Sequence, residues 1–133
     1  MISTYEAYQK EPGALTFEKM QELHREMAAE VEHDPDAEEI YDELMEKAAY
    51  YAAIRAKWNR MSREEKMEQD PLRTSAHDSM ITHFNMLARY LRMQGKKAAW
   101  RDVLGDEKAD PYVRKTIGDF GCYLVFIDAV NAR

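Results

Sequence analysis

Hydrophobic residues recur at intervals of three and four along most of the chain, the spacing typical of amphipathic α-helices. The clearest stripe lies near the amino terminus and consists of Phe17, Met20, Leu23, Met27 and Val31. Thr16 stands directly before this stripe, and a threonine there can accept a hydrogen bond from a free amide of the first helical turn. We therefore expect the first helix to begin at Thr16 and to end at the segment His33, Asp34 and Pro35.

A second helix is predicted from Asp36 to about Met61. Asp36 is followed three residues later by Glu39, the spacing of a capping box at a helix start. One line along this helix contains Ile40, Leu44, Ala48, Tyr51, Arg55 and Trp58. Because so short a linker separates the first two helices, we expect them to form an antiparallel hairpin.

The middle of the chain predicts two further helices. Ser62 and Glu65 form a second capping-box pattern, which opens a short polar helix that stops before Asp70 and Pro71. A longer helix is expected from Ser75 or Ser79 to Gln94. Its apolar line consists of Met80, Phe84, Leu87 and Leu91. Gly95 then suits the left-handed position that follows many helices, and a short helical segment is expected over residues 98–104.

The last predicted helix carries more apolar residues than the others. Asp110 followed by Pro111 is a strong helix-start pattern, and the helix should continue to about Asn131. One stripe consists of Val113, Ile117, Phe120, Leu124 and Ile127. A second stripe beside it consists of Tyr112, Thr116, Tyr123, Phe126 and Val130. A helix that is apolar over most of its circumference is normally surrounded by others, so we expect this one to be central.

Glycine and proline are distributed as an all-α fold requires. Of five Gly and four Pro residues, only Gly118 and Gly121 fall inside a predicted helix. Apolar and polar residues never alternate for more than a few positions, so no strand is predicted. We expect one domain over residues 1–133, a compact bundle of four to six helices, with residues 1–15 as an irregular arm.

Composition and charge limit the cellular locations and binding partners that we expect for this protein. The single cysteine, Cys122, excludes an intrachain disulfide. The amino terminus resembles no signal peptide, and the longest apolar run, residues 120–127, is too short to cross a membrane, so a cytoplasmic location is expected. Residues 1–70 hold 9 basic and 18 acidic residues, a net charge of −9, whereas residues 71–133 hold 10 and 7, a net charge of +3. This asymmetry is typical of two halves that pack together, or of a charged binding face.

Acidic residues on the first two predicted helices are the first candidate site, as possible ligands of a metal ion. Glu22 and Glu26 lie one turn apart on the first helix, and Glu43 and Glu46 lie one turn apart on the second. All-α nucleotide pyrophosphohydrolases hold Mg²⁺ with facing carboxylates on neighbouring helices, since a hard cation prefers oxygen ligands. The competing interpretation is a solvated acidic face. Glu30 and His33 have the spacing of a di-iron helical site, but the chain has no second Glu-x-x-His.

A basic cluster is the second candidate site. It consists of Arg89, Arg92, Lys96, Lys97, Trp100 and Arg101. Cations interleaved with an aromatic ring can contact phosphates and stack bases. However, basic residues are also favoured at the carboxyl ends of helices, and an acidic domain repels nucleic acid. We regard nucleic-acid binding as the weaker alternative.

Asp119 is the third candidate. It lies on the predicted central helix, where burial would require its carboxylate to be paired or protonated. Arg55 is the expected partner, because it interrupts the apolar line of the second helix. Such a pair serves structure in most proteins, although buried carboxylates also mark functional sites.

Other reactive side chains form no catalytic set. Ser79 and His83 lie one helical turn apart, without a pattern for an oxyanion hole, and Cys122 lies in an apolar helix, where a thiol is normally inert. No cofactor motif is present. The sequence therefore predicts a non-enzymatic module that binds another protein or a second copy of itself, with a Mg²⁺- or Mn²⁺-dependent nucleotide phosphohydrolase as the alternative. Nine Met and eight Tyr suit adaptable contact surfaces.

Overall fold

The computed structural model describes residues 15–106 and 111–131, and in these ranges it contains helices and no strand. The helices are α2 (Phe17–Val31), α3 (Pro35–Trp58), α4 (Arg63–Met93), α5 (Ala99–Leu104) and α6 (Pro111–Asn131). Their buried residues form one hydrophobic core. The expected all-α bundle is therefore confirmed. Residues 1–14 of the expected arm (residues 1–15) and the expected cap at Asp110 lie outside the described residues.

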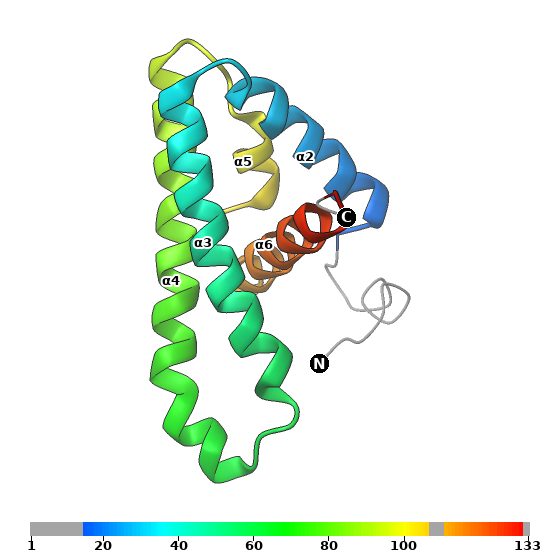
Figure 1. Ribbon diagram of the computed structural model, residues 1–133, viewed down its shortest axis with the longest axis vertical. Helices are drawn as coiled ribbons and strands as arrows, with labels where there is room; N and C mark the ends of the chain where they lie inside the picture. The colour runs from blue at the N-terminus through cyan, green and yellow to red at the C-terminus, as the bar shows by residue number, and fades with distance from the viewer. Residues whose placement is uncertain (1–14, 107–110, 132–133) are drawn as a thin grey trace.

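The longest unit of the fold is an antiparallel hairpin formed by α3 and α4 (Figure 1). These two helices pack together along much of their length, and α3 buries Leu44, Ala48 and Tyr51. The expected pairing of the first two helices is wrong, because α2 diverges from α3 at their short linker and contacts it only near that end (Figure 1). A short linker therefore determines where two helices meet, but not that they stay side by side.

A single helix, α4, occupies the region where two were expected. Pro71 lies inside this helix, so the break expected before it is wrong. A proline cannot donate a backbone hydrogen bond to the carbonyl four residues earlier, here that of Met67. Pro71 and Met67 are both exposed, so water can hydrate the carbonyl that the proline leaves without a partner.

The end of α2 and the start of α3 are connected by Asp34. The side chain of Asp34 accepts hydrogen bonds from the backbone of Asp36 at 3.1 Å and of Ala37 at 3.2 Å, and Pro35 occupies the first helical position. Asp34 rather than Asp36 is therefore the cap, which corrects the expected capping box. The hydroxyl of Tyr90 on α4 donates to both carboxylate oxygens of Asp34 at 2.9 Å. The capping residue of α3 therefore also connects α3 to α4.

Three other predicted helix boundaries agree with the structure. Thr16 accepts a hydrogen bond from the backbone of Lys19 at 3.0 Å. Ser62 and Glu65 form a reciprocal capping box at the start of α4, with both hydrogen bonds at 3.1 Å. Gly95 follows the end of α4 with a φ of 84°, the left-handed conformation that glycine adopts without strain.

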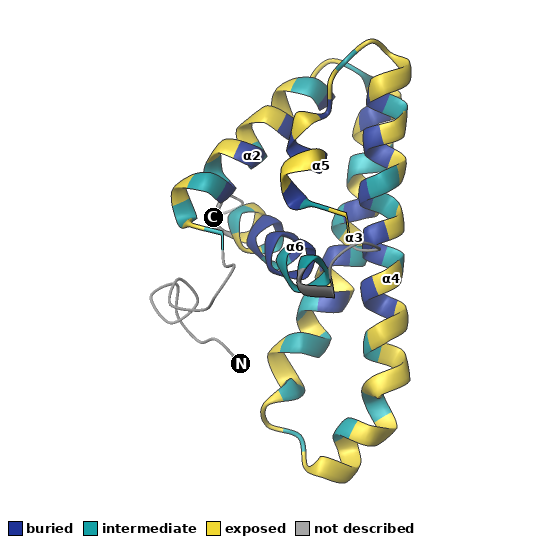
Figure 2. Cartoon of the chain, turned by 180° about the vertical axis from the view of Figure 1, so that it is seen from behind, coloured by how far each residue is buried: buried dark blue, intermediate teal, exposed yellow. Residues whose placement is uncertain are grey.

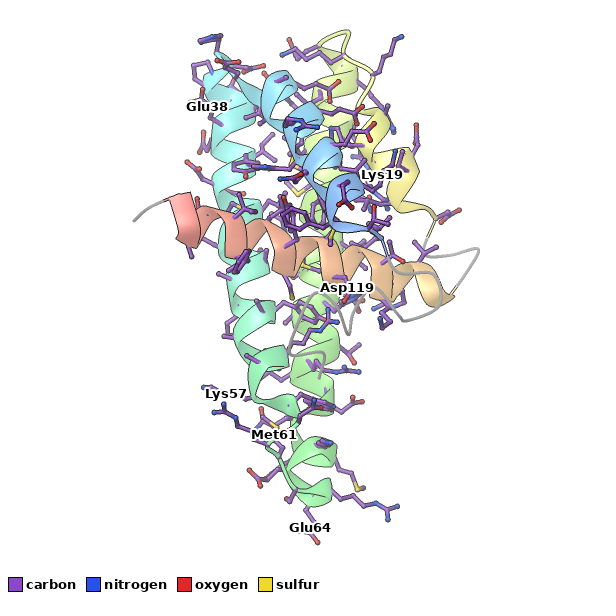
Figure 3. All side chains as sticks on the ribbon, turned by 90° about the vertical axis from the view of Figure 1, so that its right-hand side faces the viewer. Lys19, Glu38, Lys57, Met61, Glu64 and Asp119 are labelled. Carbon is purple, nitrogen blue, oxygen red and sulfur yellow. The ribbon has the colours of Figure 1, made fainter. Side chains whose placement is uncertain are left out.

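Helix α6 lies across the hairpin and contacts every other described helix (Figure 3). Ile117, Phe120 and Leu124 of its first apolar stripe are at most 1% exposed. The second stripe is not enclosed, because Phe126 is 52% exposed. Above α6, helices α2 and α5 complete the core, whereas the tip of the hairpin projects beyond it and is largely exposed (Figure 2). No described helix is long and apolar enough to span a membrane.

Candidate anion-binding pocket

A pocket of about 420 Å³ opens where α6 meets the projecting half of the α3–α4 hairpin. Its lining comes from three helices and consists of Tyr51 and Arg55 on α3, Arg73, Thr74 and His77 on α4, and Arg114 and Lys115 on α6. Asp119 lies beside it, on the side of α6 that faces the hairpin tip (Figure 3). Four of the seven lining residues carry a fixed positive charge, so the pocket has the charge expected of an anion site.

Asp119 is buried and holds two of these cations. Its carboxylate pairs with Arg55 Nη2 on one oxygen and lies 3.3 Å from Lys115 Nζ on the other. Burial disfavours the charge of Arg55, but the adjacent carboxylate outweighs that effect, so the pKa of Arg55 is raised above its ordinary value. The structure thus brings Asp119 and Arg55 together, as the sequence suggested, and adds Lys115 to the pair.

His77 positions Arg114. Its Nε2 lies 2.7 Å from the backbone carbonyl of Arg114 and must donate to it, so Nδ1 is the acceptor and lies 3.3 Å from Arg114 Nη2. The same Nη2 pairs with Asp78. Burial lowers the pKa of His77, and the neighbouring positive charges of Arg114 and Arg73 act in the same direction. His77 is therefore neutral at pH 7, as its acceptor role requires.

Arg73 forms the outer wall of the pocket. Its guanidinium lies over the ring of Trp58, with Cζ 4.5 Å from the ring centroid, and its Nε is 3.9 Å from Asp70. The charge of Arg73 acts on the titration of both Tyr51 and His77. Arg73 is thus held by a ring and a weak ion pair, and it remains partly exposed to a ligand.

Gly118 permits the close packing beside the pocket. A Cβ atom at this position would lie 2.9 Å from His77 Nε2 and 3.1 Å from the hydroxyl of Tyr51. The rings of Tyr51 and His77 meet edge to face, with centroids 4.9 Å apart. The missing side chain therefore lets two polar rings from the hairpin approach the backbone of α6.

The lining is suited to binding more than to bond breaking. Arginine presents several N–H donors in a fixed fork, and the hydroxyls of Tyr51 and Thr74 can also donate to an anion. Burial raises the pKa of Tyr51, and both ring nitrogens of His77 are engaged by Arg114, so neither side chain is prepared to act as a base. Cys122 beneath Arg55 also has a raised pKa because of burial, which disfavours the thiolate.

The carboxylates that the metal hypothesis needed do not converge. Glu22 and Glu26 are exposed on α2, and Glu43 and Glu46 are exposed on α3, which diverges from α2. Within the described part of the chain, no group of three His, Cys, Asp or Glu side chains could hold a metal ion. These four glutamates are solvent-exposed carboxylates on two separate helices.

The basic cluster at the end of α4 is divided between the core and the surface. Trp100 is fully buried and Arg101 is 8% exposed, so neither can stack on a base. Arg101 donates to Asn85 and to the carbonyl of Gly105, both at 2.7 Å. Arg89 and Lys97 are exposed. The expectation of one basic aromatic surface is therefore wrong.

Two other residues of this cluster hold the connection between α4 and α5. Arg92 donates to the carbonyls of Lys97 and Ala98 at 3.2 Å and to Asp102 at 2.9 Å. Lys96 Nζ donates to the carbonyl of Glu30. Their charges are engaged by backbone and carboxylate groups of the protein itself, which explains their spacing without a ligand.

Glu30, considered above with His33 as a metal pair, has a structural role instead. Its carboxylate accepts hydrogen bonds from the backbone of Ala98 at 3.0 Å and from Trp100 Nε1 at 2.8 Å. His33 is exposed and lies beside Glu32. Similarly, His83 contacts the backbone carbonyl of Ser79 rather than its hydroxyl, so this pair is not a catalytic one.

Sequence reasoning missed the pocket as a set. Arg73, His77, Arg114 and Lys115 are not among the candidate site residues predicted from the sequence. Arg73 and His77 are spaced four apart and share a helix face, which is a local signal. The meeting of α3, α4 and α6 at one point has no such signal, because it depends on the crossing of α6 over the hairpin.

The chain was also compared with known proteins. No protein-family model matches it, and neither a curated protein nor a solved structure shows significant similarity.

Proposed function

We propose that this protein is a non-enzymatic binding module that takes an anionic group of its partner into the pocket between α3, α4 and α6. One observation carries the proposal: Arg55, Arg73, Arg114 and Lys115, from three helices, line one cavity. Like charges repel unless something compensates them, and clustered arginines commonly serve to recognise phosphate or carboxylate groups. The pocket volume of about 420 Å³ lies in the range of about 300–1,000 Å³ typical of ligand sites.

The positions of the arginines are supported by the surrounding residues, as a binding site requires. Asp119 orients Arg55, His77 and Asp78 orient Arg114, and Trp58 supports Arg73. A side chain that is already oriented loses less conformational entropy when a ligand binds. The ion pairs therefore favour binding even though they compensate part of the positive charge.

The partner can be another protein or a second copy of this chain. Several large apolar side chains are exposed, among them Phe126 on α6 at 52% and Tyr50 on α3 at 52%. Aromatic residues are enriched in protein interfaces. Sedimentation velocity over a hundredfold range of concentration distinguishes the two, since only self-association changes the sedimentation coefficient of the pure protein.

Isothermal titration calorimetry on the full chain tests the proposal. The titrants are inorganic phosphate, citrate and acetate in a low-chloride buffer, and we expect saturable binding of at least one of them. Arg114→Gln should weaken that binding about tenfold or more, as the loss of a charge-assisted hydrogen bond predicts. Arg89→Gln, an exposed change further along α4, is the control and should leave the affinity unchanged. Absence of binding by all three anions would contradict the proposal.

A further inference from the structure

We infer that a groove between α2 and α3 is a docking site for an amphipathic helix of another protein, one whose apolar stripe is flanked by Lys and Arg. The groove has a volume of about 550 Å³. Its walls include Arg25, Ala28, Ala29 and Glu32 on α2, and Glu38 and Tyr41 on α3. These residues differ from those that line the anion pocket, so this inference does not depend on the proposed function.

The α2 wall of the groove has small side chains at its centre. Four of its residues have the spacing i, i+3, i+4, i+7 and therefore share one face of the helix: Arg25, Ala28, Ala29 and Glu32. Both alanines are exposed, although their neighbour Met27 is fully buried. The distance between two packed helices depends on the side chains at their contact, and small residues allow the closest approach. This face of α2 can therefore receive a ridge of side chains from another helix.

The α3 wall provides an aromatic side chain. Tyr41 is half-buried, packs against the hydrophobic core and lines the groove. Burial raises the pKa of Tyr41, and the nearby carboxylates of Asp128 on α6 and Asp42 on α3 act in the same direction. Aromatic residues that are held in place and reach the surface are common anchors of protein interfaces. Tyr41 thus offers an apolar ring to a partner, with carboxylates close to its hydroxyl.

The charges around the groove favour a basic partner. Arg25 is the cation of the lining, and four carboxylates surround it and Tyr41 as an acidic rim, which consists of Glu32, Glu38, Asp42 and Asp128. One positive and four negative groups give a net charge of −3. His33, which lies 3.2 Å from Glu32, adds positive charge only when it is protonated. Charges of one sign attract a partner of the opposite sign and disfavour one of the same sign.

The shape of the groove favours a helix as the occupant. Helices α2 and α3 meet at their linker and then diverge, so faces that a closed bundle would bury against each other line the groove instead (Figure 1). Amphipathic helices bind grooves of this kind through side chains at i, i+3, i+4 and i+7. Small-molecule sites instead use polar groups that converge, whereas Arg25 and Glu32 stand at opposite ends of the alanine pair. A second copy of this chain, with a net charge of −6, matches the acidic rim less well than a basic helix.

Fluorescence anisotropy with designed peptides tests the inference on the full chain. The peptides have about 18 residues, or five helical turns, with Ala, Leu or Phe along one stripe and Lys on both flanks. Each has a counterpart with Glu in place of Lys and another with the same composition in scrambled order. We expect at least one Lys peptide to bind tenfold or more tightly than both of its counterparts. Failure of every Lys peptide to bind, or equal binding of the counterparts, would overturn the inference.

Substitutions on the two walls locate the binding. Ala28→Gln together with Ala29→Gln fills the centre of the groove with larger polar side chains and should weaken the binding of the Lys peptide about tenfold or more. Ala49→Gln, the same change at an exposed position of α3 outside the lining, should leave it unchanged. Wild-type affinity in the folded double variant would show that the peptide binds elsewhere, which contradicts the inference.

A charge reversal of the rim provides a second, independent test. Glu32→Lys together with Glu38→Lys should weaken the binding of the Lys peptide about tenfold and improve that of its Glu counterpart. Glu68→Lys on α4 is the matched control and should change neither affinity. All of these positions are exposed, and circular dichroism establishes that each variant is folded. Unchanged affinities in the rim variant would overturn the inference of a basic partner.

Sedimentation velocity distinguishes the remaining occupant, a second copy of this chain. Self-association of the wild type that is lost in the Ala28→Gln, Ala29→Gln variant would assign the groove to a second copy and overturn the inference. A monomeric chain that binds the Lys peptide with the expected dependence on both walls would support it. Neither result bears on the anion pocket, whose ligands are titrated separately.

Discussion

Arg55 of α3 and Asp119 of α6 form a buried ion pair that joins two helices far apart in the sequence. Asp119 is 7% exposed, and the side chain of Arg55 is 20% exposed. A buried charge is tolerated only where it is paired and hydrogen-bonded, so each side chain requires the other. The pair lies beside the pocket, and it fixes the orientation of the Arg55 guanidinium.

Replacement of Asp119 by asparagine should destabilise the protein. Asp119→Asn leaves Arg55 without its counter-charge, and breaking a buried pair in this way costs about 3–5 kcal/mol. Thermal and urea unfolding followed by circular dichroism measure the loss. Asp42→Asn, an exposed change on α3, is the matched control and should have little effect. Equal unfolding curves for the two variants would show that the pair does not stabilise the fold.

A double replacement separates stability from binding. Arg55→Met with Asp119→Leu exchanges the ion pair for apolar contacts, and such exchanges are often neutral or stabilising. We expect this variant to unfold at a higher temperature than Asp119→Asn, yet to bind inorganic phosphate several-fold more weakly than the wild type. Wild-type affinity in a folded double variant would exclude Arg55 from the binding site.

The Arg55–Asp119 contact could be expected from sequence because its signals are local. Each charge interrupts a helical line of apolar residues, and a buried carboxylate requires a partner. The rest of the pocket depends on where α6 crosses the hairpin. That crossing results from packing among Ile117, Phe120 and the hairpin, and no spacing along the chain specifies it.

The errors in the fold expectations have similar causes. The rules for helix caps and helix breakers predicted most helix ends correctly. They failed at Pro71, because they do not indicate whether the carbonyl that a proline leaves without a hydrogen bond is exposed to water. The acidic faces of α2 and α3 were expected to meet because a short linker joins them. The direction of α2 is determined instead by its contacts with α5 and α6.

His77 should make stability fall as the pH falls. Its pKa is lowered in the folded chain, mainly by burial, so below about pH 6.5 the unfolded chain binds protons that the folded chain does not. The free energy of unfolding should therefore decrease from pH 7 to pH 5, and His77→Gln should reduce this dependence. Urea unfolding at several pH values provides the measurement.

His24 serves as the comparison for His77. Burial also lowers the pKa of His24, so His24→Gln should reduce the pH dependence of stability in the same direction. His24 does not line the pocket, and only the His77 variant should also weaken the binding of inorganic phosphate. The positioning role of His77 would be contradicted if both variants bound the ligand as the wild type does.

The two glycines of α6 should differ in their tolerance of a methyl group. Gly118→Ala pushes against the rings of His77 and Tyr51, and such overpacking costs about 1–3 kcal/mol, partly offset by about 1 kcal/mol of helix propensity. Gly121→Ala meets the thioether of Met80, which is fully buried, but an unbranched methionine side chain adapts to its surroundings more readily than two rings do. Thermal unfolding should rank Gly118→Ala as the less stable of the two. The reverse order would show that the packing at Gly118 is loose.

Glu30 should stabilise the connection between α2 and α5. Its carboxylate is the acceptor for the backbone N–H of Ala98 and for the indole N–H of Trp100, and both donors are fully buried. Glu30→Ala leaves two buried donors without an acceptor, at a cost of about 1–3 kcal/mol each. Urea unfolding followed by tryptophan fluorescence reports the loss directly, because Trp100 is at the contact.

Two variants of the same helix make this test specific. Glu26→Ala removes an exposed carboxylate one turn earlier on α2 and should leave the midpoint of unfolding nearly unchanged. Glu30→Gln keeps one acceptor oxygen and should recover part of the loss, since its amide can accept from only one side. If Glu30→Ala unfolded at the same urea concentration as Glu26→Ala, the two hydrogen bonds would contribute nothing, and Lys96 with Arg92 would be the groups that hold this end of the bundle together.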